Sequence, residues 1–338
     1  MLKVDGALLA QDLAHAGGEA KHLEELGYDG GFTFEGPHDP FFPLLLAARE
    51  TSRLELATAI AIAFARTPML LANLGYDLQA FSRGRFILGL GSQIRPHIER
   101  RFSMPWSRPA ARMRELVLAI RAIWRCWDEG EKLDFRGEFY THTLMTPFFD
   151  PGPNPFGCPR IFLAGVGPRM TEVAGEVADG FFVHPFNTIE SIRDVTLPAL
   201  ELGLALSGRE RAAFQVSHQL MIVTGANDEE LERARSAVRS QIAFYGSTPA
   251  YRLVLESRGW GALQPELNAL SKRGRWVEMA GLVSDEMLEA IAVCAPPSAL
   301  AAKLRERTRG FADRVSLVAP WAPDPARWSE VIRELRAD

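Results

Sequence analysis

The 338-residue chain contains few cysteines, and their scarcity narrows the class of protein. Cys126, Cys158 and Cys294 lie far apart and form no Cys-x-x-Cys pair. Neither a zinc site nor a disulfide framework is therefore expected, and we predict no bound metal. Unpaired thiols are typical of a reducing compartment, so the predicted location is cytoplasmic.

Long apolar runs and an excess of basic charge are also lacking. No stretch of about 18 apolar residues occurs, and the first residues lack a basic segment followed by a sustained apolar one. The formal net charge is −4, and lysines and arginines are scattered along the chain. We therefore expect no membrane partner and no nucleic-acid partner, because phosphate backbones require a clustered basic surface.

One stretch, residues 95–114, does concentrate arginines. Prolines interrupt it, and Glu99 dilutes its charge. Two interpretations are open: a loop that lies over an anionic small molecule, or a solvated charged loop.

Short apolar runs rich in β-branched and aromatic residues alternate with longer stretches of helical periodicity. Strands are expected at residues 4–9, 31–35, 54–62, 86–90, 160–164, 180–184, 214–224 and 314–318. Helices are expected at residues 13–26, 43–51, 68–81, 110–127, 168–178, 189–206, 229–245, 298–309 and 326–336.

About eight strands, each followed by a helix, predict an α/β fold of the (β/α)8 TIM-barrel type. A doubly wound open parallel sheet is the second choice. Residues 135–146 are expected to form a small hairpin or an extended excursion. Residues 246–294 do not fit one more strand and helix, so we expect an insertion there, before the last strand and helix, that caps one barrel face. The whole chain, residues 1–338, is predicted to be a single domain.

In such a barrel the carboxyl ends of the strands carry the chemistry. The second strand ends in a segment that brings together Glu35, His38 and Asp39. A carboxylate beside an imidazole forms a proton-handling pair. The alternative is a turn shaped by Gly36 and Pro37, with Asp39 capping the next helix.

Glycines at the end of the fourth strand, above all Gly91, allow the backbone to approach a ligand closely, and Ser92 and Gln93 supply polar contacts. The dinucleotide pattern GxGxxG is not met, because Ile94 stands where its third glycine would be. The alternative is that the glycines only relieve crowding at a barrel strand end.

Gly165, Val166, Gly167 and Pro168 end the next strand and open a helix, where free backbone N–H groups can bind a phosphate and Arg169 can add a charge. The alternative is a tight turn between strand and helix. His184 ends the following strand and either lines the same pocket or is a core histidine.

No nucleophile elbow, HExxH motif or Ser-His-Asp order occurs, so hydrolase and zinc-protease functions lack their residues. A barrel with anion-binding turns and no evident nucleophile indicates that a cofactor performs the chemistry.

Several longer runs resemble the luciferase-like flavin and deazaflavin oxidoreductases. They are LATAIAIAFARTPMLLANLGYDLQAFSRGRFILGLGSQ (residues 56–93), RMRELVLAIRAIW (112–124), GEFY (137–140) and PRIFLAGVGPRMTEVAGEVADGFFVH (159–184). The last helix and strand are similar too, so the resemblance covers nearly the whole chain in the right order.

Within that family, EGPHDPFFPLLLAA, AFARTPM, LGLGSQ and RFSMPW look most like the branch that uses the deazaflavin coenzyme F420. The resemblance implies hydride transfer with a small organic substrate, a coenzyme phosphate at residues 165–169, and a coenzyme ring near Ala59, Ile60 and Ser92. It also implies proton handling by His38 and Glu35, a cis peptide at Ala59–Ile60, and a homodimer.

The chain departs from the family pattern at two places. Glu35 followed by His38 replaces an adjacent Asp-His pair, and Gln93 stands where the family usually has a third glycine. Two other functions compete with the F420-dependent oxidoreductase: an FMN-dependent monooxygenase, and a non-catalytic flavin-binding protein.

Overall fold

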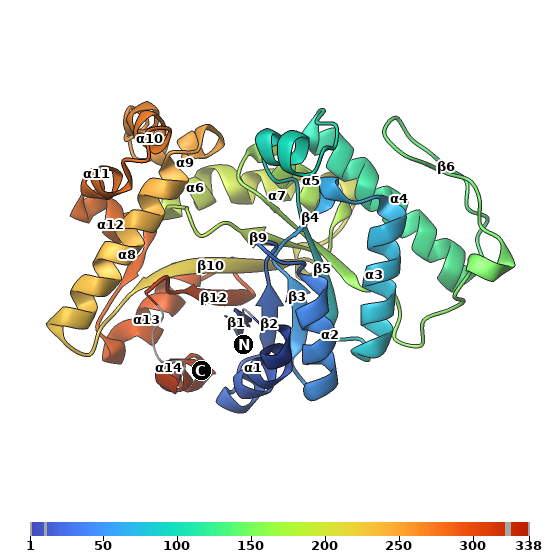
Figure 1. The fold of residues 1–338 in the computed structure, drawn as a ribbon, viewed down its shortest axis with the longest axis horizontal. Helices are drawn as coiled ribbons and strands as arrows, with labels where there is room; N and C mark the ends of the chain where they lie inside the picture. The colour runs from blue at the N-terminus through green and yellow to red at the C-terminus, as the bar shows by residue number, and fades with distance from the viewer. Residues whose placement is uncertain (1, 10–11, 322–325, 337–338) are drawn as a thin grey trace.

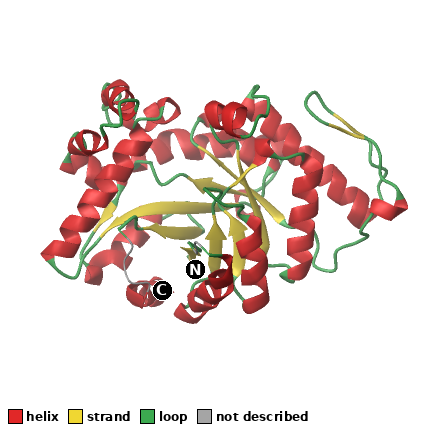
Figure 2. Cartoon of the chain, viewed as in Figure 1, coloured by secondary structure: helices red, strands yellow, loops and turns green. Residues whose placement is uncertain are grey.

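Eight parallel strands close into a barrel in this computed structural model, which describes residues 2–9, 12–321 and 326–336. The strand order is β1, β2, β3, β5, β8, β9, β10 and β12 (Figures 1 and 2). Because β12 pairs with β10 on one side and with β1 on the other, the sheet has no open edge. The predicted (β/α)8 barrel is therefore confirmed, and the open sheet is excluded.

The barrel strands are β1 (Lys3–Ala7), β2 (Gly30–Thr33), β3 (Glu55–Thr58), β5 (Phe86–Gly91), β8 (Arg160–Gly165), β9 (Gly180–Val183), β10 (Gln215–Val223) and β12 (Arg314–Val318). The larger helices are α1 (Leu13–Leu26), α2 (Phe41–Glu50), α3 (Pro68–Phe81), α4 (Pro109–Glu129), α5 (Pro168–Val177), α7 (Leu197–Ser207), α8 (Asp228–Gly246), α13 (Pro297–Thr308) and α14 (Ala326–Arg336). A three-residue helix, α6 (Ile189–Ser191), and a π-helical turn lead into α7.

Local residues define where the helices begin and end. The Asp12 side chain accepts the N–H of Ala14 at the start of α1, and Gly27 ends that helix with a φ of 93°. This left-handed conformation suits glycine because it has no Cβ. Thr67 caps α3 and Pro68 is its first residue. Both helices have the predicted bounds.

The third predicted strand, residues 54–62, is interrupted. It consists of β3 and a short β4 (Ala61–Ile62), separated by a cis peptide bond between Ala59 and Ile60. The Thr58 hydroxyl bridges the interruption, because it accepts the N–H of Gly89 at 2.9 Å and donates to the Gly89 carbonyl at 2.7 Å. A side chain on Gly89 would meet the Thr58 carbonyl, so glycine is required there. The expected cis peptide is confirmed. The prediction of one continuous strand over residues 54–62 was wrong.

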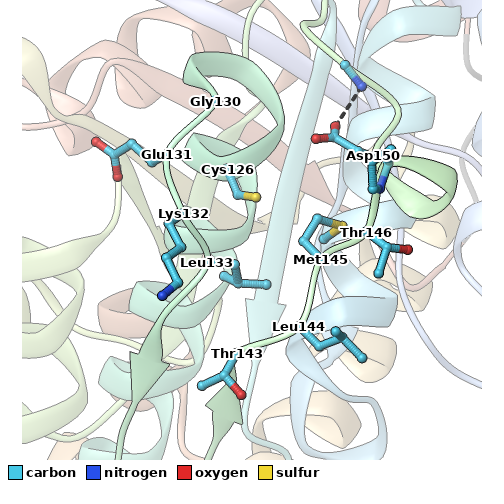
Figure 3. A pocket seen from close by; sticks show the side chains of 12 residues that line it. Cys126, Gly130, Glu131, Lys132, Leu133, Thr143, Leu144, Met145, Thr146 and Asp150 are labelled. Atoms are coloured by element: carbon cyan, nitrogen blue, oxygen red, sulfur yellow. Dashed lines mark hydrogen bonds between the residues drawn. The ribbon is translucent and has the colours of Figure 1, made fainter.

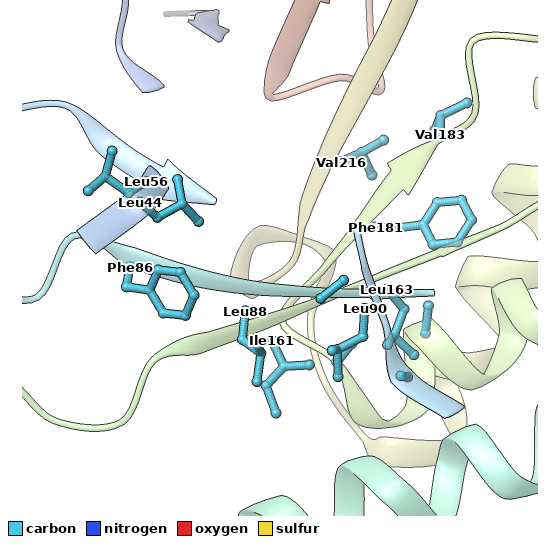
Figure 4. Close-up of a cluster of buried hydrophobic side chains, with 14 of the residues drawn as sticks. Leu44, Leu56, Phe86, Leu88, Leu90, Ile161, Leu163, Phe181, Val183 and Val216 are labelled. Carbon is cyan, nitrogen blue, oxygen red and sulfur yellow. The ribbon is translucent and has the colours of Figure 1, made fainter. Parts of the chain in front are cut away.

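Alternate residues of each strand face the barrel interior and the surrounding helices. The inward cluster contains Phe32, Ala57, Ile87, Phe162 and Phe182. The outward side chains pack against the helices in a larger cluster, part of which Figure 4 shows: Leu56, Leu88, Leu90, Ile161, Leu163, Phe181, Val183 and Val216.

Two additions flank the barrel, on opposite sides in Figure 1. The segment that follows α4 forms the predicted hairpin, with β6 (Phe135–Arg136) paired antiparallel to β7 (Thr141–His142). After α8 come four short helices, α9 (Arg252–Glu256), α10 (Leu263–Ser271), α11 (Trp276–Gly281) and α12 (Asp285–Ile291), and then β11 (Val293–Cys294). Three of these helices pack on α8, and β11 pairs with β10.

In the described part of the chain, none of the helices is both long and apolar enough to span a bilayer. The described residues also contain no group of three or more His, Cys, Asp or Glu side chains arranged to hold a metal ion. The three cysteines are unpaired.

Candidate functional site

The loop that follows β2 holds both carboxylates of the predicted trio, and both contact one arginine. Glu35 Oε2 lies 2.7 Å from Arg66 Nη1, and Asp39 Oδ2 lies 2.9 Å from Arg66 Nη2. Burial disfavours the charged guanidinium, but the two carboxylates outweigh burial and raise the pKa of Arg66. Asp39 also accepts the N–H of Phe41, the first residue of α2, but the N-cap of that helix is Pro40 and has no side-chain cap, so the predicted cap at Asp39 is wrong.

Glu35 also connects this loop, through hydrogen bonds, to the residues at and after the Ala59–Ile60 cis peptide. Its Oε2 accepts the N–H of Ile62 at 2.7 Å, and its N–H donates to the Ile60 carbonyl at 3.0 Å. Arg66 Nη1 donates to the Ile62 carbonyl as well. With only 6% of its side chain exposed, Glu35 is a partly desolvated group that fixes the shape of the barrel mouth.

His38 lies exposed on the same loop, five residues beyond Thr33, the last residue of β2. The loop is held at both ends: the Thr33 hydroxyl donates to the Pro40 carbonyl at 2.7 Å, and Arg101 donates to the Gly36 carbonyl at 2.6 Å. His38 is therefore exposed to solvent on a loop whose backbone is anchored.

The arginines of residues 95–114 are mostly engaged within the protein. Arg95 pairs with Glu99, Arg108 with Glu138, and Arg114 with Glu176. Arg112 is buried, and its guanidinium contacts the Tyr140 hydroxyl and the Pro105 carbonyl. These pairings favour a structural loop at the rim of the mouth over an open anion-binding surface.

The end of β5 lies directly against the cis peptide segment. A Cβ on Gly91 would come within 2.8 Å of the Ile60 side chain, so the missing side chain allows this contact. The next residues are partly exposed: the Ser92 hydroxyl donates to the Gln93 carbonyl, and Gln93 has a φ of 56°. Gln93 thus holds the left-handed conformation that the family's usual glycine would adopt freely.

The turn between β8 and α5 has the features of an anion site. Gly167 precedes Pro168, the first residue of α5, and the first turn of α5 contains neither an acidic residue nor a side-chain cap. The Cβ position of Gly167 has no atom within 4 Å, so the turn is open on that side. Arg169 is exposed, and none of the described carboxylates pairs with it.

His184 follows β9 and lies between two tyrosine rings. The ring centroids of Tyr245 and Tyr251 are 4.6 Å and 4.7 Å from that of His184. Burial among these rings lowers the pKa of His184 to about 3, so the imidazole is neutral at physiological pH. Val166, in the turn after β8, packs against an apolar cluster formed largely by α8 and the segment after it. Tyr245 and Tyr251 pack against the same cluster.

Small side chains line the interior where these loops meet. Ala7, Ala59, Ile60 and Ala164 are partly buried and lie on the inward aromatic cluster that contains Phe162. A floor of alanines above aromatic rings suits a flat, mostly apolar ring system, since shallow apolar surfaces are what such ligands cover.

A separate cavity of about 490 Å³ lies outside this region (Figure 3). It is bounded by the C-terminal end of α4 and by residues 143–152, with Cys126, Leu133 and Met145 among its lining side chains. Helices of a barrel run opposite to its strands, so the C-terminal end of α4 belongs to the face away from the strand ends. The candidate site remains at the strand ends.

The structure therefore brings the predicted residues together around one mouth, but three contributors were not foreseen. Arg66 joins carboxylates that lie about thirty residues away along the chain, and no local pattern marks such a pairing. Tyr245 and Tyr251 come from the end of α8 and from the turn after it, where the sequence indicated only helix and insertion.

A closed parallel barrel with loops of glycines and polar side chains at its strand ends defines the class of (β/α)8-barrel proteins. The chain belongs to the luciferase-like monooxygenase family, which matches residues 2–314. Solved structures with the same fold include a coenzyme F420 dependent reductase and a monooxygenase in complex with FMN.

Two relatives and one solved structure illustrate the similarity. The chain is 60% identical over 314 residues to the protein Rv1360 of Mycobacterium tuberculosis H37Rv, covering 93% of this chain and 92% of that one. It is 27% identical over 328 residues to the 5,10-methylenetetrahydromethanopterin reductase of Archaeoglobus fulgidus, covering 93% of each. The coenzyme F420 dependent tetrahydromethanopterin reductase from Methanopyrus kandleri matches with a TM-score of 0.80 and 20% identity, over 98% of this chain and 96% of that one.

Proposed function

We propose that this protein is a coenzyme F420-dependent oxidoreductase that transfers a hydride between the deazaflavin and a small organic substrate. The observation that carries the proposal is the open turn at Gly167, followed by an unpaired Arg169, beside an alanine-lined barrel mouth. The name of the F420 dependent reductase from Methanopyrus kandleri supports F420 over a flavin.

The residues of the mouth fit the parts of such a coenzyme. Backbone N–H groups of Gly165, Val166, Gly167 and Arg169 would hold the phosphate together with the Arg169 guanidinium, because a helix start attracts an anion. Pro168, which has no N–H, would only shape the turn. Ala59, Ile60, Gly91, Ser92 and Gln93 would border the ring. Bound there, F420 would supply a carbon centre that accepts or donates a hydride.

His38 is the residue that we propose for proton handling. It is exposed on an anchored loop next to the mouth, so it can meet both a substrate oxygen and solvent. Glu35, the second residue expected in this role, is engaged with Arg66 and with the N–H of Ile62. We propose that Glu35 acts through these contacts as a positioning residue for the cis peptide segment.

An FMN-dependent monooxygenase is the alternative, which the family's own description favours. The phosphate turn and the alanine floor would serve either coenzyme, since both carry a phosphate and a flat ring. Non-catalytic flavin binding is a third candidate function. It differs from the two catalytic functions because it predicts that replacing His38 leaves ligand binding and function unchanged.

Equilibrium titration with F420 and, in parallel, with FMN, followed by the fluorescence of each, tests the proposal. Tight binding of F420 and weak binding of FMN are expected. A preference for FMN would overturn the F420 assignment and favour the monooxygenase.

His38→Ala tests whether the site is catalytic. The variant is expected to bind F420 as the wild type does and to lose roughly 100-fold in turnover, the scale of removing a general acid or base. Turnover is followed as oxidation of reduced F420 in a screen of small ketones and aldehydes. His22→Ala, at an exposed position on α1, is the matched control. Equal turnover in His38→Ala and wild type would exclude His38.

We also propose that the chain is a single domain in which residues 246–294 cap one side of the mouth. The segment starts at the end of α8 and returns to the barrel through β11, which pairs with β10. Tyr251, near its start, contacts His184 at a strand end. These contacts support an extension of the barrel over an independent unit.

A homodimer is the proposed assembly, supported by exposed apolar side chains on two adjacent helices. Phe42 is 60% exposed on α2, and Leu70 and Phe81 are 53% and 51% exposed on α3. Exposed apolar side chains gathered in this way favour a protein interface. Light scattering should give twice the chain mass, and Leu70→Lys should halve it, whereas Leu144→Lys on the excursion after α4 should not. A monomeric wild type would contradict the proposal.

A further inference from the structure

The imidazole of His184 is held in a defined orientation at the mouth. Phe182, two residues earlier, belongs to the inward cluster, and His184 continues that inward face past the end of β9. Tyr245 packs edge-on against the imidazole at an interplanar angle of 78°, and Tyr251 lies against it at 51°. The two tyrosines come from α8 and from the turn Pro249–Tyr251, so two different elements clasp the same ring.

Hydrogen bonds determine which nitrogen of His184 carries the proton. Its Nδ1 accepts the N–H of Phe186 at 3.1 Å, and an accepting Nδ1 in a neutral imidazole leaves the hydrogen on Nε2. Asn187 stabilises the same loop, because its amide donates to the His184 carbonyl at 2.7 Å and its Oδ1 lies 3.2 Å from Nε2 of buried His218. The ring and its tautomer are thus prepared before a ligand arrives.

The surroundings of His184 offer hydrogen bonding without charge. Its ring neighbours are tyrosines, and burial keeps the imidazole neutral by lowering its pKa to about 3. Arg258, a cation of the adjacent segment, pairs with Glu190 and Glu286. An anion placed against these rings would lose its hydration and gain no opposite charge, which is costly.

We propose that His184 is a substrate-binding residue that donates its Nε2 hydrogen to an uncharged oxygen acceptor, and that the substrate is a neutral carbonyl or hydroxyl compound whose apolar part packs on Tyr245 and Tyr251. The inference rests on the proposed oxidoreductase function and adds the chemical class of the substrate.

Two probes of similar shape and different charge test the substrate class: acetophenone, which is neutral, and benzoate, which is an anion. Saturation-transfer NMR with the full-length protein, with and without F420, measures the affinity for each. Acetophenone should bind at least about 10-fold more tightly than benzoate, because one charge left without a partner costs more than 1.4 kcal/mol. Equal binding of the two probes, tighter binding of benzoate, or binding of neither overturns the proposal.

Variants of His184 test the hydrogen bond. His184→Ala should weaken acetophenone binding about 10-fold, whereas His184→Gln, whose amide places an N–H near the Nε2 position, should stay within about 3-fold of the wild type. His22→Gln on α1 is the matched control and should match the wild type. Unchanged acetophenone affinity in His184→Ala would remove the residue from the substrate site. Thermal unfolding of each variant verifies that it folds.

The tautomer is measured without any ligand. Long-range ¹H–¹⁵N spectra of protein labelled in its histidines, at pH 7, should show His184 as the Nε2–H form, with its signal assigned by its loss in His184→Gln. A protonated ring or an Nδ1–H tautomer would contradict the geometry from which we argue. Because this measurement and the apo-protein probe titration need no coenzyme, failure of F420 to bind would overturn the proposed function separately.

Discussion

At Gln93 the backbone conformation is one that favours glycine, whereas the side chain makes a hydrogen bond that glycine could not make. It follows β5 with a φ of 56°, a conformation that costs an ordinary residue roughly 1 kcal/mol and glycine almost nothing. The side chain offsets part of this cost, because its Oε1 accepts the N–H of Ile94 at 2.9 Å. The position therefore keeps a glycine-like shape while it presents an amide at the barrel mouth.

A pair of substitutions separates the two contributions at Gln93. Gln93→Ala loses the hydrogen bond and keeps the Cβ, whereas Gln93→Gly loses both. Gln93→Gly should be more stable than Gln93→Ala by about 1 kcal/mol, since only glycine escapes the left-handed penalty. Urea unfolding measures both. A Gln93→Ala variant at least as stable as Gln93→Gly would mean that the loop relaxes out of the observed conformation.

The roles of residues that contact their neighbours in the sequence could be predicted. The roles of residues that contact others far away along the chain could not. Gly27 ends α1 because a helix end needs a left-handed residue, and that requirement is visible in the adjacent sequence. Arg66 joins Glu35 and Asp39 across a loop and an interrupted strand, and nothing in the spacing of these residues specifies the contact. The resemblance to a family, and not periodicity, located the cis peptide.

At the scale of whole elements, one uninterrupted run of apolar residues concealed a break between two strands. Residues 54–62 are apolar almost throughout, so periodicity predicts one strand, yet β3 and β4 are separate strands that each pair with β5. The prediction of the ends was more accurate for some other elements: α1, α3, β12 and α14 begin and end at the predicted residues. The short helices after α8 lack strong periodicity, so only an insertion could be expected there.

Helix α4 positions two loops of the site through Arg112. The guanidinium donates to the Pro105 carbonyl at 2.5 Å and to the Tyr140 hydroxyl at 2.8 Å, and it lies 4.7 Å from the centre of the Phe64 ring. One buried side chain thus joins the rim loop before α4, the hairpin after it and the turn that follows β4. Burial makes each of these contacts stronger than its equivalent in water.

Arg112→Met keeps the apolar stem and removes the charge, so it tests this junction. The variant should lose about 2–3 kcal/mol of stability, because the Pro105 carbonyl and the Tyr140 hydroxyl lose a charged donor. Hydrogen exchange should rise in residues 102–108 and 139–142 in particular. Arg125→Met, on the exposed side of the same helix, is the control and should change stability by less than 1 kcal/mol. Unchanged exchange in the two loops would show that other contacts hold them.

At the scale of the whole molecule, a network of charged side chains lies at the end of the barrel opposite the site. Arg314, which is 2% exposed, contacts both oxygens of Asp5 at 2.6 Å and 2.8 Å and also pairs with Glu55. Glu55 in turn contacts Arg160 at 2.5 Å and Lys3 at 2.8 Å. These side chains come from four strands and close the barrel floor.

This network makes the stability of the barrel depend on pH. Burial alone would raise the pKa of Glu55, but Arg314, Arg160 and Lys3 lower it from the ordinary value of 4.5 to about 2. The folded-state pKa is below the unfolded one, so the stabilisation is fully present above pH 4.5 and is lost as the pH falls toward 2. At pH 7 the shift corresponds to about 3 kcal/mol.

Glu55→Gln should therefore be less stable than the wild type by about 3 kcal/mol at pH 7, and the difference should shrink steadily between pH 4.5 and pH 2 as the wild-type carboxylate is protonated. Urea unfolding at a series of pH values measures it. Glu306→Gln, in the exposed pair with Lys303, is the control and should match the wild type at every pH. A difference for Glu55→Gln that stays constant down to pH 2 would mean that packing, and not the carboxylate charge, holds the barrel floor together.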